Sequence, residues 1–409
     1  MHGESSKASL GASCPSDEEN GRMSFDQRGG VSDNMQAVLK MGEYARSRMS
    51  GNVLAVTGSA GKTTVVAMLA HALSAWGDVG KSHHNANLPA GVAWNLASIP
   101  WDTPHVVLEL AVGKMAISAR MARPRVAVFT NVLPAHLGER STVADIARTK
   151  SAIFLGMAPG GKAVLNRDMQ EWHTVHDAAQ RQKLDIWTYG TSDECMCQLL
   201  RYDAAGRQAH VRIKDREISF PIGAAGYHMA LNGLAVLAAV SALGHPLEPA
   251  IAQLGSFAAL PGRGEEISLS LDGRRLTVID DAYNANPGSM RAALARLGDY
   301  EGGRRRIAVL GEMAELGPGA AAYHTELAGF IQDRSIDEVH VVGELYADFW
   351  KALSPALRGS HAGSRQVLSE ILRERLADGD VVLFKGSHST GMHELVARLK
   401  KSADDGAVV

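Results

Sequence analysis

A glycine-rich segment, TGSAGKTT at residues 57–64, constrains the fold of this 409-residue chain more than any other feature. It lies between a continuous apolar run, NVLAVT at 52–57, and a stretch at 62–76 that we expect to be helical. A strand that is apolar at every position is typical of a parallel strand buried on both faces. The segment therefore predicts a strand, a tight turn and a helix, the repeating unit of α/β folds.

The same segment predicts a phosphate-binding loop. Small residues let backbone N–H groups turn toward phosphate oxygens, and the following helix adds the positive end of its dipole. We expect Lys62 to neutralise the β- and γ-phosphates of a nucleotide and the Thr63 hydroxyl to bind Mg²⁺. The residues expected to bind the nucleotide here are Gly58, Ser59, Ala60, Gly61, Lys62, Thr63 and Thr64. Val56 occupies the position of the first Walker glycine, and the loop alone does not separate a kinase, a nucleotide-driven switch and a ligase.

The apolar pattern divides the rest of the chain into a tail and two α/β domains. Residues 1–35 are rich in Ser, Gly, Asp and Glu, so we expect a disordered tail, followed by a short amphipathic helix at 36–49. A Pro-Gly-Arg-Gly turn at 261–264 indicates a joint between a central domain, 36–261, and a second domain, 262–409.

Within the central domain we expect strands at 105–110, 125–130 and 162–166, an edge hairpin in 199–221 and a helix at 227–243. The second domain alternates four predicted strands with four predicted helices. Its strands are expected at 275–280, 306–310, 338–342 and 380–384, and its helices at 288–297, 320–332, 366–376 and 391–401. The fold class is therefore α/β, with a central P-loop ATPase-type parallel sheet and a C-terminal Rossmann-like domain.

Composition excludes several functional classes. The formal net charge of -2 gives no basic surplus for nucleic acid. The chain has no run of about 18 apolar residues and a polar N-terminus, so we expect neither a membrane span nor a signal peptide. Three cysteines, Cys14, Cys195 and Cys197, cannot form a disulfide framework and lack a second Cys/His pair at zinc spacing. A reducing, cytoplasmic location is the expectation.

Seven further motifs carry a family resemblance. They are VVLELAVGKM (106–115), FTNVLPAHLGERSTVADIARTKSAIF (129–154), GYHMALNGLAV (226–236), PGRG (261–264), VIDDAYNANPGSM (278–290), VLGEMAELG (309–317) and FKGSHSTGMHEL (384–395). In this order, over roughly residues 50–400, they resemble the Mur ligase family. The resemblance implies a central ATP-binding domain, a Rossmann-like C-terminal domain and closure between them. It also implies a reaction in which ATP phosphorylates a carboxylate and an amine displaces phosphate from the acyl phosphate, leaving an amide and ADP.

The resemblance also implies a metal site with two Mg²⁺ ions. Glu109 ends a buried strand beside the phosphate loop, where a carboxylate suits Mg²⁺. His136 matches the family's metal-binding histidine, and Lys150 matches a lysine that CO₂ converts to a metal-binding carbamate. At pH 7 the neutral amine that this conversion needs costs about 4.6 kcal/mol for an unperturbed lysine. The plainer interpretations are a surface acid, a solvated loop histidine and an exposed helical lysine.

The resemblance assigns five positions around the nucleotide. Asn232 matches an adenine-side asparagine, and Arg263 would reach the phosphates as the domains close. Asp281 matches a ribose-binding acid, with Tyr283 and Asn284 beside it. Plainer interpretations are a helix-face polar residue for Asn232 and a solvated turn residue for Arg263. Asp280 is an alternative to Asp281, or else the cap of the helix after Pro287.

The resemblance also assigns residues to the donor carboxylate and the acceptor amine. Asn87 matches an asparagine-rich loop near the reacting carboxylate, although Leu88 replaces the second asparagine. Lys385, Ser387 and His388 follow a predicted strand, at the sheet edge where ligands bind, and are expected to hold the acceptor amine. His388 stands where the family has arginine, and histidine is a weaker, pH-dependent carboxylate clamp.

The length of the N-terminal region bears on which substrate we expect. Peptidoglycan members of the family carry an N-terminal domain that binds a UDP-sugar, whereas about 50 residues precede the phosphate loop here, too few for a domain with its own core. We therefore expect an ATP-dependent ligase joining a small amino acid, peptide or natural-product carboxylate to an amine, or using a donor presented by a carrier or partner protein. The alternatives are a peptidoglycan-precursor ligase that adds D-alanyl-D-alanine to a UDP-muramoyl tripeptide, a P-loop kinase or ATPase, and a scaffold that only retains ATP binding.

Overall fold

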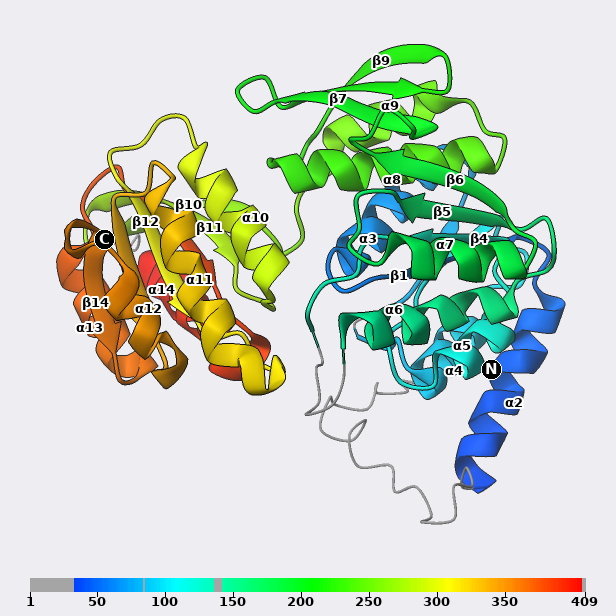
Figure 1. Ribbon diagram of the computed structural model, residues 1–409, viewed down its shortest axis with the longest axis horizontal. Helices are drawn as coiled ribbons and strands as arrows, with labels where there is room; N and C mark the ends of the chain where they lie inside the picture. Colours follow the sequence, from blue (N-terminus) through cyan, green and yellow to red (C-terminus); the bar gives the residue numbers. More distant parts are fainter. Residues whose placement is uncertain (1–32, 84, 136–141, 407–409) are drawn as a thin grey trace, which may run out of the picture.

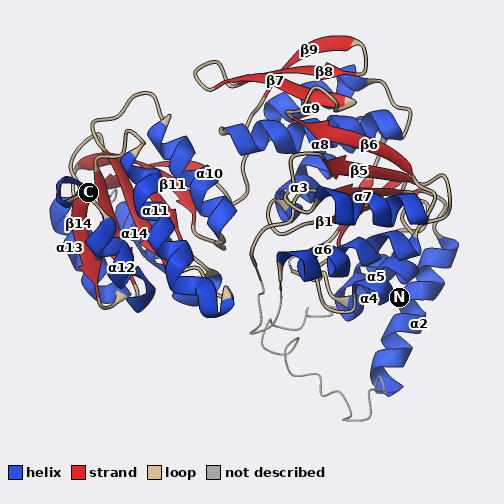
Figure 2. Ribbon diagram, viewed as in Figure 1, coloured by secondary structure: helices blue, strands red, loops and turns tan. Residues whose placement is uncertain are grey.

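The computed structural model describes residues 33–83, 85–135 and 142–406. These residues form two lobes, each built on its own sheet, and the first lobe precedes the second along the chain (Figure 1). Figure 2 shows that helices cover the sheets on both faces. Within the described ranges, each helix falls short of the length or the apolar character that a membrane span requires.

The first lobe is built on a nine-stranded sheet with the order β2-β3-β1-β4-β5-β6-β7-β8-β9. Neighbouring strands from β2 to β7 pair in parallel, and β7, β8 and β9 continue the sheet as antiparallel strands. The strand bounds are β1 Asn52–Thr57, β2 Val79–Lys81, β3 His105–Glu109, β4 Val126–Phe129, β5 Lys162–Asn166, β6 Asp185–Gly190, β7 Cys197–Asp203, β8 Gln208–Ile213 and β9 Arg216–Pro221.

Helices pack on both faces of this sheet because alternate residues of each strand point to opposite sides. In β1, Leu54 and Val56 enter one apolar core with α3, α8 and α9, while Val53 and Ala55 enter the other with α2, α4, α5, α6 and α7. The helix bounds are α2 Asp33–Arg48, α3 Lys62–Leu73, α4 Pro89–Ser98, α5 Met115–Ala122, α6 Val143–Ser151, α7 Trp172–Arg181, α8 Tyr227–Ala242 and α9 Leu247–Ser256.

The second lobe has a six-stranded sheet with the order β10-β11-β15-β12-β13-β14, parallel except for β10. Helices α10, α11 and α12 cover one face, and α13 and α14 cover the other. The bounds are β10 Glu265–Leu271, β11 Arg274–Asp281, α10 Pro287–Gly298, β12 Arg306–Gly311, α11 Ala320–Gln332, β13 Glu338–Val342, α12 Ala347–Ala352, β14 Arg358–Ala362, α13 Arg365–Arg375, β15 Val381–Lys385 and α14 Met392–Gly406.

The predicted α/β class with two sheets is confirmed. The predicted edge hairpin is instead three strands, β7, β8 and β9. The predicted tail lies outside the described residues up to residue 32, and residues 33–35 belong to α2 rather than to a tail. The limits 36–261 and 262–409 stay a prediction. Cys195 and Cys197 are free and buried, and Cys14 lies outside the described residues.

Candidate active site

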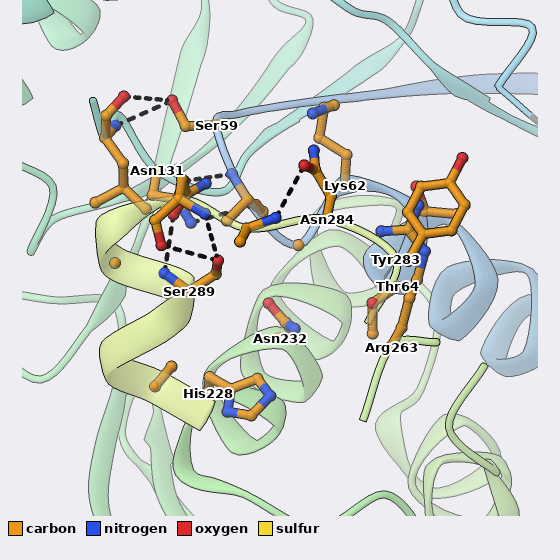
Figure 3. A pocket seen from close by; sticks show the side chains of 18 of the residues that line it. Ser59, Lys62, Thr64, Asn131, His228, Asn232, Arg263, Tyr283, Asn284 and Ser289 are labelled. Atoms are coloured by element: carbon orange, nitrogen blue, oxygen red, sulfur yellow. Dashed lines mark hydrogen bonds between the residues drawn. The ribbon is translucent and has the colours of Figure 1, made fainter. Parts of the chain in front are cut away.

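The turn between β1 and α3 has the backbone of a phosphate loop. Gly58 and Gly61 have φ angles of 150° and 80°, a region that favours glycine. A Cβ on Gly58 would lie 1.9 Å from the Thr130 hydroxyl oxygen, so only glycine fits there. The segment after β4 supports the loop: the Ala60 N–H donates to Asn131 Oδ1 at 2.9 Å, and Ser59 and Asn131 lie together in Figure 3.

Two lysines meet at one carbonyl of this loop. Lys62 Nζ donates to the Gly58 oxygen at 3.1 Å, and Lys150 Nζ donates to the same oxygen at 2.9 Å. Lys150 comes from α6 and is 2% exposed, so it is not an exposed helical lysine. Burial lowers the pKa of Lys150 to about 7, helped by the charge of Lys62 and opposed by Glu109. Burial also lowers the pKa of Lys62.

A carboxylate and a hydroxyl lie side by side next to the loop. Glu109, at the end of β3, is buried, and its Oε2 accepts a hydrogen bond from Thr63 Oγ1 at 2.7 Å. Its Oε1 accepts from Asn87 Nδ2 at 2.9 Å, and its backbone N–H donates to the Ser82 hydroxyl at 2.8 Å. This pair of hard oxygen ligands fits Mg²⁺. The described residues contain no cluster of three or more His, Cys, Asp or Glu side chains that could hold a metal. His136 lies outside the described residues.

The second lobe places a charged pair opposite the loop. Lys385, at the end of β15, is 1% exposed and its Nζ donates to Asp281 Oδ2 at 2.7 Å and to the Asn284 carbonyl at 3.1 Å. The strands β11 and β15 pair in parallel, which brings their carboxyl ends to the same edge. Lys385 therefore orients Asp281 and ties the two strands together.

Asp280 has a different environment from Asp281. Its Oδ2 accepts a hydrogen bond from Lys400 Nζ at 3.1 Å, and its Oδ1 accepts from the Ala282 N–H at 3.3 Å. The cap of α10 is Asn286, whose side chain accepts from the Ser289 N–H at 2.8 Å. The suggestion that Asp280 caps this helix was therefore wrong, because Asn286 lies directly before the first turn.

A cavity of about 960 Å³ lies between the lobes, and most predicted site residues line it. The predicted site residues that line the cavity are Ser59, Ala60, Gly61, Lys62, Thr63, Thr64, Asn87, Glu109, Asn232, Arg263, Asp281, Tyr283, Asn284, Lys385 and His388. Gly58 and Lys150 are not among the lining residues, and they contact each other through the Gly58 carbonyl. Ser387 does not reach the cavity because its hydroxyl accepts from the Ala314 N–H at 2.8 Å and donates to the Ala285 carbonyl at 3.3 Å.

Several polar lining residues were not among the predicted site residues. Asn131, His228 and Ser289 line the cavity and appear in the close-up of Figure 3. Burial lowers the pKa of His228 to about 4, opposed by the charge of Asp281, so the ring is neutral near pH 7. His228 lies one helical turn before Asn232 on α8, a spacing that could have identified it. Asn131 follows a predicted strand, at the sheet edge where ligands bind.

Among the described residues, two of the contacts between the lobes lie beside the cavity. Asn85 Nδ2, in the first lobe, donates to Tyr283 Oη, in the second. On the other side, α10 approaches the segment after β4 so closely that a Cβ on Gly288 would lie 2.6 Å from Leu133 Cδ1. Arg263 stacks over the Tyr283 ring, with Cζ 4.2 Å from its centroid. The cavity is therefore enclosed by both lobes.

Comparison with known proteins gives a consistent result. The family models for the Mur ligase middle domain and the Mur ligase, glutamate ligase domain match residues 56–240 and 262–388. The UDP-N-acetylmuramoyl-tripeptide–D-alanyl-D-alanine ligase of Escherichia coli is 29% identical over 91% of this chain and 82% of its own length. Both lobes of this chain are included in that alignment.

Solved structures agree with the family models. A MurF crystal structure from Acinetobacter baumannii superposes with a TM-score of 0.80 at 26% identity, covering 91% of this chain and 81% of that one. MurF from Thermotoga maritima, in complex with ADP, superposes with a TM-score of 0.79 at 25% identity, covering 94% and 88%. With both domain models matched in order around the cavity, the chain belongs to the Mur ligase family of ATP-dependent ligases, which form amide bonds and release ADP.

Proposed function

We propose that this ligase joins the carboxylate of a UDP-muramoyl tripeptide to the amine of D-alanyl-D-alanine. The observation that carries the proposal is a phosphate loop that shares one cavity with the charged pair Lys385 and Asp281. In addition, 91% of the chain aligns with the UDP-N-acetylmuramoyl-tripeptide–D-alanyl-D-alanine ligase of Escherichia coli. These relatives favour the peptidoglycan donor over the small natural-product carboxylate that the N-terminal region suggested.

The chemistry begins with transfer of the γ-phosphoryl group of ATP to a carboxylate oxygen of the donor, which gives an acyl phosphate and ADP. Lys62, on the cavity wall, stabilises the negative charge on the transferring group. Thr63 and Glu109 would hold Mg²⁺, which supplies further charge neutralisation at the phosphoryl oxygens. A second ion would be held by His136 and by Lys150 as its carbamate.

The second half-reaction is attack of the acceptor's neutral amine on the acyl carbon. The carbon–nitrogen bond forms, the carbon–oxygen bond to phosphate breaks, and the nitrogen loses a proton. We assign His388 to the acceptor, because it lies on the cavity wall. Lys385 acts on the acceptor indirectly, since its ammonium is held by Asp281. On the nucleotide, we assign Asp281 and Asn232 to the ribose and adenine and Arg263 to the phosphates, because all three line the same cavity.

A substrate-omission assay tests this function. With MgATP, UDP-muramoyl tripeptide and D-alanyl-D-alanine, ADP release should require both substrates, and hydroxylamine in place of the amine should trap an acyl hydroxamate. Lys62→Ala should lower ADP release by at least about a hundredfold, because the loop loses the charge that stabilises the transition state. Lys40→Ala, on the exposed face of α2, is the matched control and should behave as wild type.

Three results would contradict parts of the proposal. ADP release that needs neither substrate would support the kinase or ATPase alternative. Turnover of small acids but not of UDP-muramoyl tripeptide would reject the donor while keeping the ligase. Near-normal activity of Lys62→Ala would reject the assignment of the phosphate loop.

A further inference from the structure

The contact between Asn85 and Tyr283 joins the two lobes beside the cavity. Asn85 lies in a turn between β2 and α4 of the first lobe, and Tyr283 follows β11 of the second. The side-chain amide of Asn85 donates to the Tyr283 hydroxyl, and both residues line the cavity. The hydrogen bond therefore depends on how the two lobes lie relative to each other.

The turn that carries Asn85 also holds the candidate metal ligand. The Asn87 N–H donates to the Asn85 carbonyl at 2.7 Å, and the Asn87 side chain donates to Glu109 Oε1 at 2.9 Å. The other oxygen of Glu109 accepts from the Thr63 hydroxyl at 2.7 Å. A continuous set of contacts thus runs from Tyr283 in the second lobe to the phosphate loop in the first.

The turn is braced from behind by a fully buried amide. Asn95, on α4, donates from Nδ2 to the Ala86 carbonyl at 2.8 Å and accepts from the His83 N–H at 3.0 Å through Oδ1. In addition, the Ala111 N–H donates to the Asn87 carbonyl at 3.1 Å. A turn held this way moves as a unit, so a constraint on Asn85 also acts on the position of Asn87.

Tyr283 is fixed by the joint between the lobes. Its backbone N–H donates to the Gly262 carbonyl at 3.0 Å, and the Arg263 guanidinium stacks on its ring. A Cβ on Gly262, whose φ is 69°, would lie 3.1 Å from the Tyr283 Cβ. The hydroxyl position is therefore set by the PGRG turn at 261–264, where the chain passes between the lobes.

We propose that Tyr283 and Asn85 are positioning residues for phosphoryl transfer. Their hydrogen bond forms when the lobes close, and it fixes the turn so that Asn87 holds Glu109 beside Thr63. The inference rests on the proposed ATP-dependent ligase function. It adds that closure of the two lobes controls the rate of phosphoryl transfer. Neither side chain needs to touch the transferring group, so the contact acts on the rate of the reaction and leaves nucleotide affinity largely unchanged.

A double-mutant cycle tests the pair in the full-length enzyme. Tyr283→Phe keeps the ring under Arg263 and removes only the hydroxyl, whereas Asn85→Ala removes the donor. Each variant should lower kcat about tenfold, the effect of losing one hydrogen bond, with KM for ATP within about twofold of wild type. The double variant should be no slower than either single variant, because the same interaction is lost. Tyr44→Phe, at an exposed tyrosine of α2, is the matched control and should behave as wild type.

Small-angle X-ray scattering supplies a readout that needs no donor or acceptor. With saturating MgATP, Tyr283→Phe and Asn85→Ala should both have a larger radius of gyration than wild type. Equal radii in all three proteins, additive losses of kcat, or a raised KM for ATP at unchanged kcat would each overturn the inference. Failure of the proposed function would be visible separately, as wild-type protein that binds MgATP and becomes compact but releases no ADP with any donor.

Discussion

At the scale of single residues, burial and the nearby charge of Lys62 explain the lowered pKa of Lys150. Two ammonium groups donate to the Gly58 oxygen, and one of them is almost fully buried. Removing a buried charge from beside another positive charge is favourable, which is why the pKa of Lys150 falls to about 7. At pH 7 the neutral amine then costs less than about 1 kcal/mol, compared with about 4.6 kcal/mol for an unperturbed lysine. Burial of Lys150 thus lowers the cost of the amine form that a reaction with CO₂ would need.

Carbamate formation at Lys150 should follow this lowered pKa. With ¹³C-bicarbonate, we expect a carbamate resonance in the NMR spectrum that grows as pH rises through about 7, because only the neutral amine reacts. An unperturbed lysine would begin to react only near its pKa of about 10.4. The signal should be absent in Lys150→Arg, and a wild-type signal that rises only above about pH 9 would contradict the assigned environment.

At the residue scale, the sequence brings candidate residues together where they are neighbours in the chain. The phosphate loop, with Lys62 and Thr63, is local, and most of its residues line the cavity. Contacts between residues that are far apart in the sequence could not be predicted from it. Lys385 and Ser387 resemble ligand-binding residues in their motif, yet one pairs with Asp281 and the other bonds to backbone groups. Those partners lie on other strands and loops, so only the folded sheet identifies them.

At the scale of elements, the start of α10 brings the second lobe against the phosphate loop. Leu133, which contacts this helix at Gly288, also exchanges hydrogen bonds with Ser59 of the loop. Its N–H donates to the Ser59 hydroxyl and its carbonyl accepts from that hydroxyl, both at 3.0 Å. Glycine at 288 allows the close approach, and Asn286 begins the helix with its capping side chain.

Gly288→Ala should separate the lobes without unfolding either one. The new methyl group would meet Leu133 at 2.6 Å, whereas alanine is favourable inside a helix. We expect kcat to fall at least about tenfold, with a melting temperature close to that of wild type. Gly329→Ala, in α11 with nothing within 4 Å of its new Cβ, is the control. It should stabilise the protein by up to about 1 kcal/mol and keep full activity. Equal activity of the two variants would show that the approach of α10 is unimportant.

The strands with the clearest apolar pattern were predicted best from the sequence. The buried strands β1, β3, β4 and β15 are apolar runs, and each was expected within a residue or two of its bounds. Strand β14, RGSHA at 358–362, has no such pattern because it lies at a sheet edge and is held mainly by pairing with β13. Strand β10 alternates Ile267, Leu269 and Leu271 with polar residues, but it follows the 261–264 turn directly and was missed. Edge strands therefore account for much of the difference between the predicted strands and the observed strands.

At the scale of the whole molecule, each lobe has its own apolar cores, so its stability depends on its own buried groups. In the second lobe, His340 is fully buried, with Nδ1 2.8 Å from the Ser360 hydroxyl and Nε2 3.2 Å from Glu338 Oε1. Burial lowers the pKa of His340, Glu338 opposes this, and the charges of Arg375 and Arg305 add to it. Unfolding therefore takes up a proton once the pH is below the ordinary histidine value.

This proton uptake predicts loss of stability in acid. Because the folded-state pKa is lowered, the full stability is present above about pH 6.5 and decreases as the pH falls, by up to about 1.4 kcal/mol per pH unit. Urea unfolding between pH 7.5 and 5 should show a shallower pH dependence in His340→Gln than in wild type. His173→Gln, at an exposed histidine of α7, should keep the wild-type slope. Identical slopes in all three proteins would contradict the assignment.

The enclosure of the cavity by two lobes also affects the end of each catalytic cycle. ADP, phosphate and the amide product form in a space whose walls come from both lobes, so we expect their departure to need separation of the lobes. Separation breaks the contact between Tyr283 and Asn85. A tighter hold between the lobes would speed bond formation up to a point and then delay the departure of products, which sets an upper limit on turnover.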